Sequence, residues 1–442
     1  MSSRKRAGRK RKLSAQQSRV GTSFDPQPVS LRVERPAHGG ACVGFHDGKA
    51  YFVKHAIPGE TVVAKPYAAK GKVVFAEAIE ITVPSSQRVP TIWPDAGPGG
   101  VGGGELCHVS AAGQRLWKAE VVRDNLRRIG GTGLAQEFAS LLGESGDPAI
   151  VTQARQTQAW RTRCEFVIDE DGYPAMFVSE SNELRRVHSF PLVTNDMQAL
   201  DFWSEDSTWR ELWRPGQRIR VIDCAEGVFV RIGKNWHSSE GKRLLLNEVH
   251  YRVDGKLFAA DPNGFWQAHL EAPHMLREAL KQATQEITYW GALELYSGAG
   301  LLTDVLLAES QLESLIAIEG SSQAVLHARE NVTDAKVKHL SLSVTANEVE
   351  KQLVDMDLPG ESLVVADPPR SGLGRGIAEV MRKCAVADVV LISCDPASFA
   401  RDAALLRQNG YQAVHLQVLD IFPGTYHLEI VARFTAIDSS AK

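Results

Sequence analysis

The second half of the chain alternates between short apolar strands and helices, and this alternation restricts the possible folds most strongly. Strands that are separated by helices form parallel sheets with both faces covered, which explains their near-continuous apolar runs. The pattern predicts a doubly wound, Rossmann-like α/β domain over residues 258–442. Strands are expected at 292–296, 315–319, 363–366, 389–393, 413–419 and 429–434, and helices at 274–283, 302–308, 322–331, 376–384 and 397–409.

Reactive side chains follow the predicted strands directly. Cys394 comes after 389–393, and Asp367 comes after 363–366 and begins an Asp-Pro-Pro-Arg turn. Open α/β sheets place their chemistry at the carboxyl ends of the strands. Residues 421–429 bring His427 and Glu429 near the chain end, so a nucleophile and a base are available for covalent catalysis. The alternative for Cys394 is a buried, unreactive cysteine.

A glycine turn follows the first strand of this domain. Gly298 and Gly300 allow the backbone to bend tightly and to approach a ligand. A nicotinamide site would show a third glycine, but Thr303 occupies that place. Glu319 ends the second strand, where a carboxylate can accept both ribose hydroxyls of an adenosine. This combination favours S-adenosyl-L-methionine over a dinucleotide.

The first half of the chain has a different pattern. Residues 1–22 form a basic segment, without an acidic residue, that is expected to be a disordered tail, either attracted to phosphate backbones or only solubilising. Short strands with glycine-containing turns predict a small β-barrel over residues 23–83. A mainly-β central domain is expected over 84–257, with a helix at 114–129 that could pack on the catalytic domain.

Composition narrows the class of protein and its compartment. The chain has 442 residues, is 43% hydrophobic and 23% charged, and carries a net charge of −3, so any positive surface must be local. No apolar run approaches the roughly 20 residues of a membrane-spanning helix, so no membrane partner is expected. Six cysteines are scattered without the spacing of a disulfide framework or zinc site. We expect a cytoplasmic monomer.

Several motifs together resemble the RNA (uracil-5-)-methyltransferase family. Residues 38–60 resemble a TRAM domain, an OB-like RNA-binding barrel. Five further segments are similar to family motifs in order and spacing, and the last two are the most specific: 264–269, 295–300, 318–319, 367–370, and 393–396 together with 422–429. The resemblance covers nearly the whole chain after the tail.

The resemblance implies roles for individual residues. Cys394 would be the nucleophile and Glu429 the base. The expected partners of S-adenosyl-L-methionine are Gln267, Tyr296, Gly298, Glu319, Asn347 and Asp367. The chain departs from the family pattern at His269, Leu301 and Asp395, where family members usually carry asparagine.

A second departure concerns a metal. Many family members bind an iron–sulfur cluster through four cysteines, and the matching positions here are Asp95, Val101, Gly104 and Phe190. Such a cluster needs four thiolate ligands. We therefore expect no metal cluster.

Three other functions were weighed. An RNA cytosine-5-methyltransferase also uses a cysteine, but the terminal His427-Leu428-Glu429 and the Phe-Trp-Gln segment favour uridine. A non-catalytic RNA-binding protein would not need both Cys394 and Glu429. A small-molecule methyltransferase would not need the barrel or the basic tail. The expected substrate is a uridine in ribosomal or transfer RNA, and the sequence does not distinguish between the two.

Overall fold

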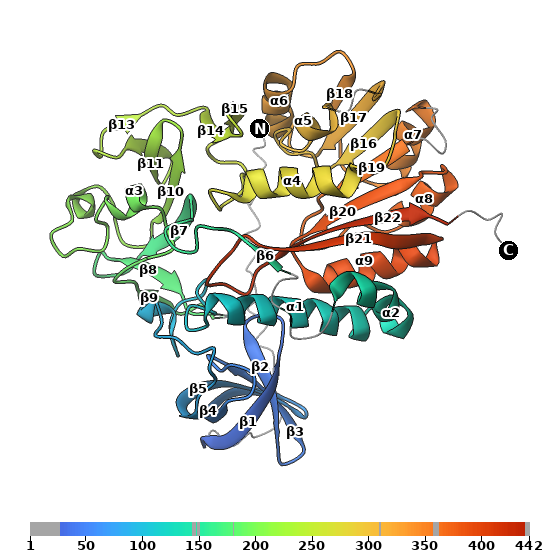
Figure 1. Ribbon diagram of the computed structural model, residues 1–442. Coiled ribbons are helices and arrows are strands. Elements are labelled where there is room, and N and C mark those ends of the chain that lie inside the picture. Colours follow the sequence, from blue (N-terminus) through green and yellow to red (C-terminus); the bar gives the residue numbers. More distant parts are fainter. Residues whose placement is uncertain are drawn as a thin grey trace, which may run out of the picture.

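The computed structural model describes residues 27–143, 147, 151–179, 181–308, 311–356 and 362–437; the basic segment 1–22 lies outside them. A β-barrel, a mainly-β central unit and an α/β domain follow one another along the chain (Figure 1). The Rossmann-like fold class with a preceding five-stranded barrel is confirmed.

The N-terminal barrel is closed, with the strand order β1-β2-β3-β5-β4. Side chains of its strands alternate between the interior and solvent, so that Leu31 and Val33 of β1 are buried while Arg32 is exposed. Its strands are β1 (Val29–Pro36), β2 (Ala41–His46), β3 (Lys49–Lys54), β4 (Thr61–Lys70) and β5 (Val73–Val83).

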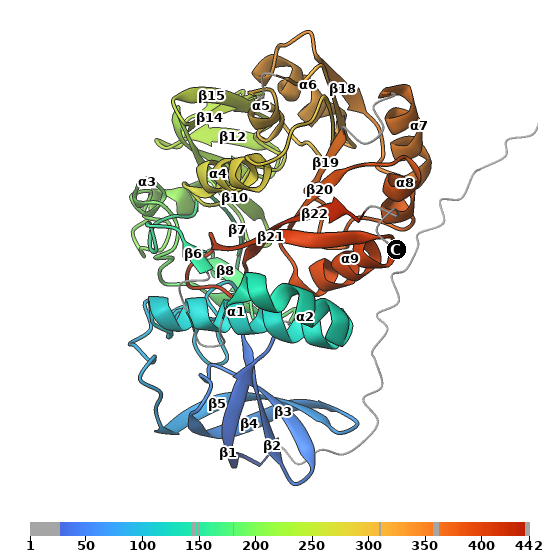
Figure 2. The same ribbon diagram turned by 45° about the vertical axis from the view of Figure 1, so that its right-hand side comes forward.

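Two helices separate the barrel from the α/β domain (Figure 2). They are α1 (Ala111–Arg128) and α2 (Gly131–Leu142), and the short η1 (Pro94–Ala96) precedes them. Trp117 and Val121 on one side of α1 belong to the core of the barrel, while Val122 and Leu126 belong to the core of the α/β domain. The helix therefore joins the two cores.

The central unit contains a seven-stranded antiparallel sheet in the order β13-β12-β11-β10-β7-β8-β9 and a separate β14-β15 hairpin. The boundary expected between residues 257 and 258 falls inside β15, so the hairpin cannot be divided there. The elements are β7 (Arg163–Ile168), β8 (Pro174–Phe177), β9 (Leu184–Arg186), α3 (Asn195–Gln198), η3 (Thr208–Glu211), β10 (Arg218–Cys224), β11 (Gly227–Ile232), β12 (Asn235–Ser238), β13 (Arg243–Leu244), β14 (Val249–Val253) and β15 (Lys256–Ala260).

The α/β domain is built on an eight-stranded sheet in the order β18-β17-β16-β19-β20-β22-β21-β6. Its last strand, β6 (Val151–Gln153), comes from the segment expected to be central and pairs in parallel with β21. The other strands are β16 (Gly291–Leu295), β17 (Ser314–Glu319), β18 (Val337–Ser341), β19 (Ser362–Ala366), β20 (Asp388–Ser393), β21 (Tyr411–Asp420) and β22 (Glu429–Ala436).

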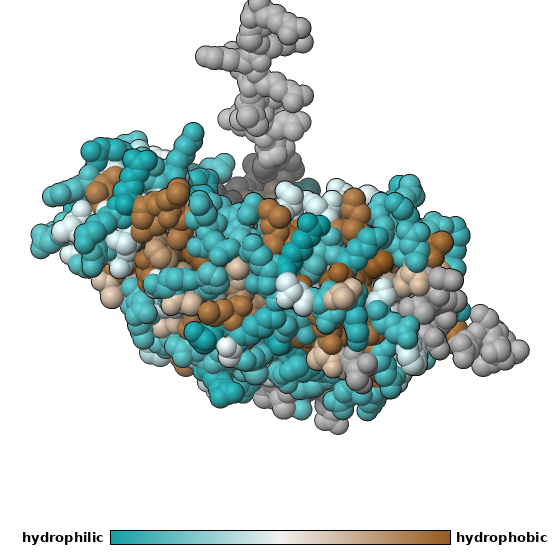
Figure 3. Space-filling model, turned by 90° about the horizontal axis from the view of Figure 1, so that it is seen from above, coloured by the Kyte–Doolittle hydropathy of each residue, from teal (hydrophilic) through white to brown (hydrophobic). Residues whose placement is uncertain are grey.

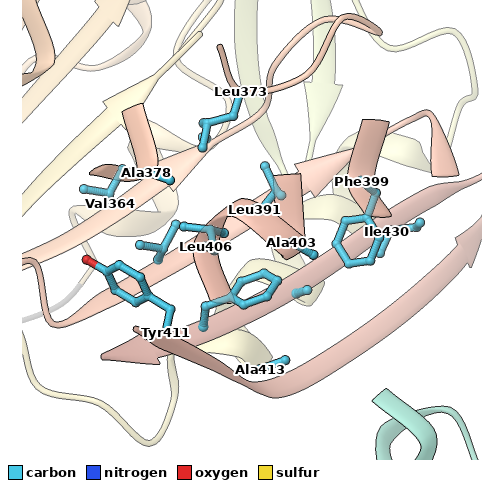
Figure 4. Packing of buried hydrophobic residues seen from close by; sticks show 14 of the residues in the cluster. Val364, Leu373, Ala378, Leu391, Phe399, Ala403, Leu406, Tyr411, Ala413 and Ile430 are labelled. Carbon is cyan, nitrogen blue, oxygen red and sulfur yellow. The ribbon is translucent and has the colours of Figure 1, made fainter. Parts of the chain in front are cut away.

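Helices cover both faces of this sheet. Side chains of α9, among them Phe399, Ala403 and Leu406, face the strands that carry Leu391 and Ile430 (Figure 4). The helices are α4 (Ala272–Thr284), α5 (Thr303–Leu306), α6 (Ser322–Asn331), α7 (Ala346–Met356), α8 (Ile377–Lys383) and α9 (Pro396–Gln408). The strand order places the topological switch at β16, between β17 and β19, where such sheets bind ligands.

The surface shows no wide apolar face from above, where hydrophobic residues form separate groups among hydrophilic ones (Figure 3). Among the described residues, no helix is long and apolar enough to cross a membrane.

Candidate active site

The predicted catalytic residues meet at the carboxyl edge of the sheet. Cys394 follows β20, and Asp367 follows the adjacent parallel strand β19. Glu429 begins β22, which runs antiparallel to β20, so its first residue lies at the same edge as the last residues of the parallel strands. The register pairs Ser393 with Ile430, which brings Cys394 next to Glu429 although 35 residues separate them in the chain.

A cavity of about 710 Å³ opens at this edge. Its lining contains both predicted catalytic residues and all but one of the predicted cofactor residues: Gln267, Tyr296, Gly298, Glu319, Asp367, Cys394 and Glu429. Asn347 does not line the cavity, because it lies exposed on the first turn of α7. The role expected for Asn347 is therefore not supported by its position.

The glycine turn has the geometry that the sequence predicted for a cofactor loop. Gly298 has φ +55° and Gly300 has φ +87°, conformations that side chains rarely adopt. Glu319 accepts hydrogen bonds from the backbone N–H of Gly298 at 3.0 Å and of Ser321 at 2.7 Å. Tyr296 also has a positive φ of 64°, and its hydroxyl donates to the Leu373 carbonyl at 2.9 Å. These contacts fix the floor of the cavity.

Four carboxyl groups, Glu294, Glu319, Asp367 and Glu429, line the cavity together with Arg161 and Arg370. Burial, together with the nearby Asp367 and Glu319, raises the pKa of Glu294 to about 8 against the opposing hydrogen bond from Thr303. Burial also raises the pKa of Asp367, and burial together with Asp367 raises the pKa of Glu429. One oxygen of Glu429, Oε2, is buried without a hydrogen-bond partner. This arrangement fits a positively charged ligand such as a sulfonium ion.

Cys394 is a protonated thiol in this arrangement. Burial, together with the charges of Glu429 and Asp367, raises its pKa to about 12, and Arg370 opposes this increase. The thiol lies just before the N-terminus of α9, whose first helical residue is Pro396, a position that ordinarily favours a thiolate. The surrounding carboxyl groups outweigh that effect.

The loop before Glu429 is held from several sides. The Arg370 guanidinium lies 3.3 Å from both ring nitrogens of His427. Burial lowers the pKa of His427 to about 3, and nearby cations such as Arg370 contribute, so this ring is neutral at physiological pH. From α1, Gln114 accepts a hydrogen bond from the Gly424 N–H at 2.7 Å, and Lys118 forms a buried ion pair with Asp420.

The structure adds residues that the sequence interpretation did not assign to the site. Glu294 lies inside β16, where an acid in an otherwise apolar strand was the available signal. Arg161 also lines the cavity. Arg163 donates hydrogen bonds to the carbonyls of Gly264 and Pro262 and thus holds the loop before Gln267.

Apolar side chains surround three of the four positions that the family resemblance matches to cluster cysteines, Val101, Gly104 and Phe190. Phe190 stacks on Trp93 with ring centroids 4.3 Å apart, and Val101 belongs to the same buried cluster. A side chain at Gly104 would meet the Trp93 ring at 2.6 Å. Asp95 accepts hydrogen bonds from the backbone of residues 188 and 189. The expectation that no cluster is bound stays a prediction.

One group with the spacing of metal ligands occurs among the described residues. The Nδ1 atom of His327 lies 3.3 Å from Glu248 and 3.5 Å from Glu330. The two carboxylates are largely exposed, and the distances are those of ordinary ion pairs.

Comparisons with known proteins agree with this geometry. A family model described as tRNA (uracil-5-)-methyltransferase matches residues 216–434. A protein of Bifidobacterium longum named an uncharacterized RNA methyltransferase is 31% identical over 438 residues, which cover 92% of this chain and 96% of that protein. A 23S rRNA (uracil(1939)-C(5))-methyltransferase of Vibrio parahaemolyticus is 25% identical, with 95% and 98% covered.

A solved structure shares the fold over most of its length. The tRNA (uracil-54, C5)-methyltransferase of Pyrococcus abyssi, solved with S-adenosyl-L-homocysteine, superposes with a TM-score of 0.66 at 20% identity and covers 92% of this chain and 99% of that chain. The chain belongs to the family of RNA (uracil-5-)-methyltransferases, enzymes that use S-adenosyl-L-methionine.

Proposed function

We propose that the protein methylates carbon 5 of a uridine in structured RNA through a covalent adduct on Cys394. The observation that carries this proposal is the meeting of Cys394, Glu429 and five of the six predicted cofactor residues in one cavity of about 710 Å³. The relatives named above act on ribosomal RNA in one case and on transfer RNA in the other. We therefore propose structured RNA as the substrate class. The cytoplasmic location and the monomeric state remain predictions.

The residue types match the needs of this reaction. Carbon 5 of uracil is a weak nucleophile, and a new bond between the Cys394 sulfur and carbon 6 turns carbon 5 into an enolate-like nucleophile. S-adenosyl-L-methionine, when bound, supplies an electrophilic methyl group. Glu429 then accepts the proton of carbon 5, and breaking the bond to carbon 6 frees Cys394. The target base must leave its stack to reach this cavity.

Other groups of the cavity serve binding and orientation. We assign the adenosine ribose to Glu319 and the positive sulfonium centre to the neighbourhood of Asp367 and Glu294. Burial raises the pKa of both of these carboxyl groups, and a bound cation would favour their charged forms. Arg161 and Arg370 are cations in the lining of the same cavity, and we assign them to the phosphates of the extruded nucleotide.

Trapping the covalent adduct tests this mechanism. RNA that carries 5-fluorouridine cannot lose the substituent at carbon 5, so the adduct should persist as a denaturant-stable complex in the presence of S-adenosyl-L-methionine. Cys394→Ala should form no complex, while Cys384→Ala, which changes a half-buried cysteine at the end of α8, should form it normally. A complex that persists in Cys394→Ala contradicts the assignment.

Glu429→Gln separates the roles of nucleophile and base. This variant should form the adduct with unmodified RNA and retain it, because no base removes the proton of carbon 5. The expected result is an accumulated complex containing methylated RNA and a turnover that falls by about 10²-fold or more. Normal turnover in Glu429→Gln would transfer the role of base to another group, with neutral His427 the nearest candidate in the cavity.

A further inference from the structure

A turn of the barrel lies against both loops that carry the proposed catalytic residues. Residues 37–40 connect β1 to β2, and the His38 Nε2 atom lies 3.4 Å from the Asp395 carboxylate, one residue after Cys394. The His38 ring also packs edge-on against Tyr426, with centroids 5.4 Å apart. Tyr426 in turn contacts His427, with ring centroids 4.1 Å apart. The barrel therefore contacts Asp395, which follows Cys394, and Tyr426, which precedes Glu429 in the chain.

The two glycines of this turn let its backbone pack closely against neighbouring residues. Gly39 and Gly40 have φ of +86° and +79°, and a side chain at Gly40 would meet Glu105 at 2.7 Å. The N–H of Ala37 donates to the Ala41 carbonyl at 2.7 Å and closes the turn. This backbone conformation holds the imidazole of His38 toward the α/β domain.

Asp395 has two contacts with different consequences. One carboxylate oxygen accepts a hydrogen bond from the Ser398 N–H at 2.7 Å and caps α9, while the other faces His38. The capped helix and strand β20 fix the two ends of the short segment that carries Cys394. The His38 contact adds a third fixed point, and it comes from a different unit of the molecule.

The same contact bears on the charge next to the nucleophile. A carboxylate one residue from Cys394 repels a developing thiolate. A donor on the outer oxygen of Asp395 withdraws part of that charge. Arg370, which lies within electrostatic range of both His38 and Cys394, acts in the same direction on the thiol.

We propose that His38 is a positioning residue that acts on Cys394 through Asp395, and that the barrel thereby helps to arrange the catalytic loop as well as to bind RNA. The inference rests on the proposed function, because it assumes that Cys394 is the nucleophile. Two simpler roles compete with it: His38 as an RNA contact only, and His38 as a fold-stabilising residue only.

Four variants of the full chain distinguish these roles. His38→Ala removes the contact, and His38→Gln keeps a donor of similar reach. Asp395→Ser keeps the helix cap but is too short to reach His38, and the double variant His38→Ala with Asp395→Ser completes a cycle. His46→Ala is the matched control, since His46 is a histidine of the same barrel whose ion pair is with Asp47.

Three quantities are measured for each variant: the dissociation constant for RNA, the single-turnover rate of adduct formation at saturating RNA, and the alkylation rate of Cys394 in the free protein by peptide mass spectrometry. His38→Ala should slow adduct formation about tenfold at saturating RNA, because misalignment of a reacting group lowers the rate even when binding is complete. It should also slow alkylation about threefold or more, because the unscreened Asp395 carboxylate disfavours the thiolate. His38→Gln should restore both rates.

The cycle supplies the outcomes that overturn the inference. In the Asp395→Ser background, adding His38→Ala should change neither rate, and a further tenfold loss there means that His38 does not act through Asp395. A weaker RNA affinity with unchanged rates makes His38 an RNA contact only. Rates in His46→Ala that fall as far as in His38→Ala point to general damage to the barrel.

The proposed function and this inference fail separately. If the wild type forms no adduct but the alkylation rates follow the expected pattern, the uracil chemistry is wrong and the His38–Asp395 link stands. If the wild type forms the adduct and all His38 variants match it in both rates, the link is wrong and the chemistry stands. Binding of S-adenosyl-L-methionine by each variant reports whether it folds; should His38→Ala fail this check, His38→Gln and Asp395→Ser still give the comparison.

Discussion

Cys394 must change its protonation state before it can act as a nucleophile. Burial and the nearby Glu429 and Asp367 raise its pKa to about 12, so the free protein holds a thiol at neutral pH. A cation bound among the carboxyl groups would oppose their effect and lower this pKa. Cys394 is then more reactive when the site is filled by a cation than when it is empty.

We predict that a cationic ligand raises the reactivity of Cys394. Sinefungin carries an amine where the cofactor carries its methylated sulfur, whereas S-adenosyl-L-homocysteine is neutral at that place. Iodoacetamide should label Cys394 about tenfold faster with sinefungin than with S-adenosyl-L-homocysteine, the effect of one pKa unit on the thiolate fraction. The two ligands occupy the same space, so steric blocking is matched. Equal labelling rates would show that the carboxyl groups do not control this thiol.

Glu294 provides a second prediction, on stability. Its pKa is raised from 4.5 to about 8 in the folded state, so the unfolded chain ionises Glu294 at a lower pH than the folded chain does. The neutral form of Glu294 therefore contributes its full share of the free energy of unfolding below pH 4.5, and this share is lost as the pH rises toward 8. Glu294→Gln keeps the acceptor for Thr303 without the charge, and should gain up to roughly 4 kcal/mol relative to the wild type across that range.

Thermal unfolding of both proteins between about pH 5 and pH 8.5 measures this difference. The melting temperature of Glu294→Gln minus that of the wild type should increase as the pH rises. Glu313→Gln, which changes an exposed acid next to β17, should show a difference that does not depend on pH. A difference that is equally flat for Glu294→Gln would contradict the raised pKa.

At the scale of elements, the sequence predicted the strands that build the site and missed those whose signals are weak or distant. Continuous apolar runs gave β16, β17, β19, β20 and β22, and with them the edge where Cys394 and Glu429 meet. Strand β18 alternates polar and apolar residues and was missed. Strand β6 has three residues, and its pairing with β21 spans more than 260 positions, so no local pattern could indicate it.

Helix α7 explains the misplaced Asn347. Val349 and Leu353 of α7 lie four residues apart on one buried face, the spacing of an amphipathic helix. The resemblance implied that Asn347 contacts the cofactor. The helical periodicity instead puts Asn347 on the exposed side of α7. The places of the residues after strand ends could be predicted because strand direction alone fixes where they lie, while their roles stay predictions.

Helix α2 also lacked a predicted role, and it provides a test at this scale. Phe138 of α2 is fully buried and contacts Phe399 and Phe434 of the α/β domain, with ring centroids 5.7 and 6.0 Å apart. Phe138→Ala should lower the free energy of unfolding by about 3–5 kcal/mol, the usual effect of removing a buried phenyl ring. The exposed Gln136→Ala on the same helix should change it by about 0.5 kcal/mol or less.

Denaturant unfolding measures the free energies of both variants. The same experiment distinguishes an α2 that is part of the α/β domain from an α2 that is an independent appendage. If α2 is part of the α/β domain, Phe138→Ala should shift the unfolding of that domain and weaken S-adenosyl-L-methionine binding near the midpoint. Loss of α2 helicity without any effect on the rest of the domain would instead make α2 an independent appendage.

At the scale of the whole molecule, α1 connects the barrel and the α/β domain and also contacts the loop that leads to Glu429. Its outer side chains lie in the core of the barrel, its inner side chains lie in the core of the α/β domain, and Lys118 between them is buried against Asp420. Lys118 also donates to the Phe422 carbonyl at 3.2 Å, in the loop that leads to Glu429. Helix α1 thus links the barrel directly to the loop that leads to Glu429.

Charge distribution gives the last prediction. The net charge of −3 leaves RNA to be held by local cations, and the first nineteen residues hold a dense group of them without an acid. Each phosphate contact made by a cation adds to the salt dependence of binding. Deletion of residues 1–19 should therefore weaken RNA binding at moderate salt and flatten the slope of log Kd against log salt. Binding of S-adenosyl-L-methionine should not change, because the cofactor residues begin at Gln267.

Replacement of the tail's arginines and lysines by glutamine is the matched control, and it should reproduce the deletion if charge is the cause. An unchanged affinity and slope after deletion would leave RNA binding to the barrel and the central unit.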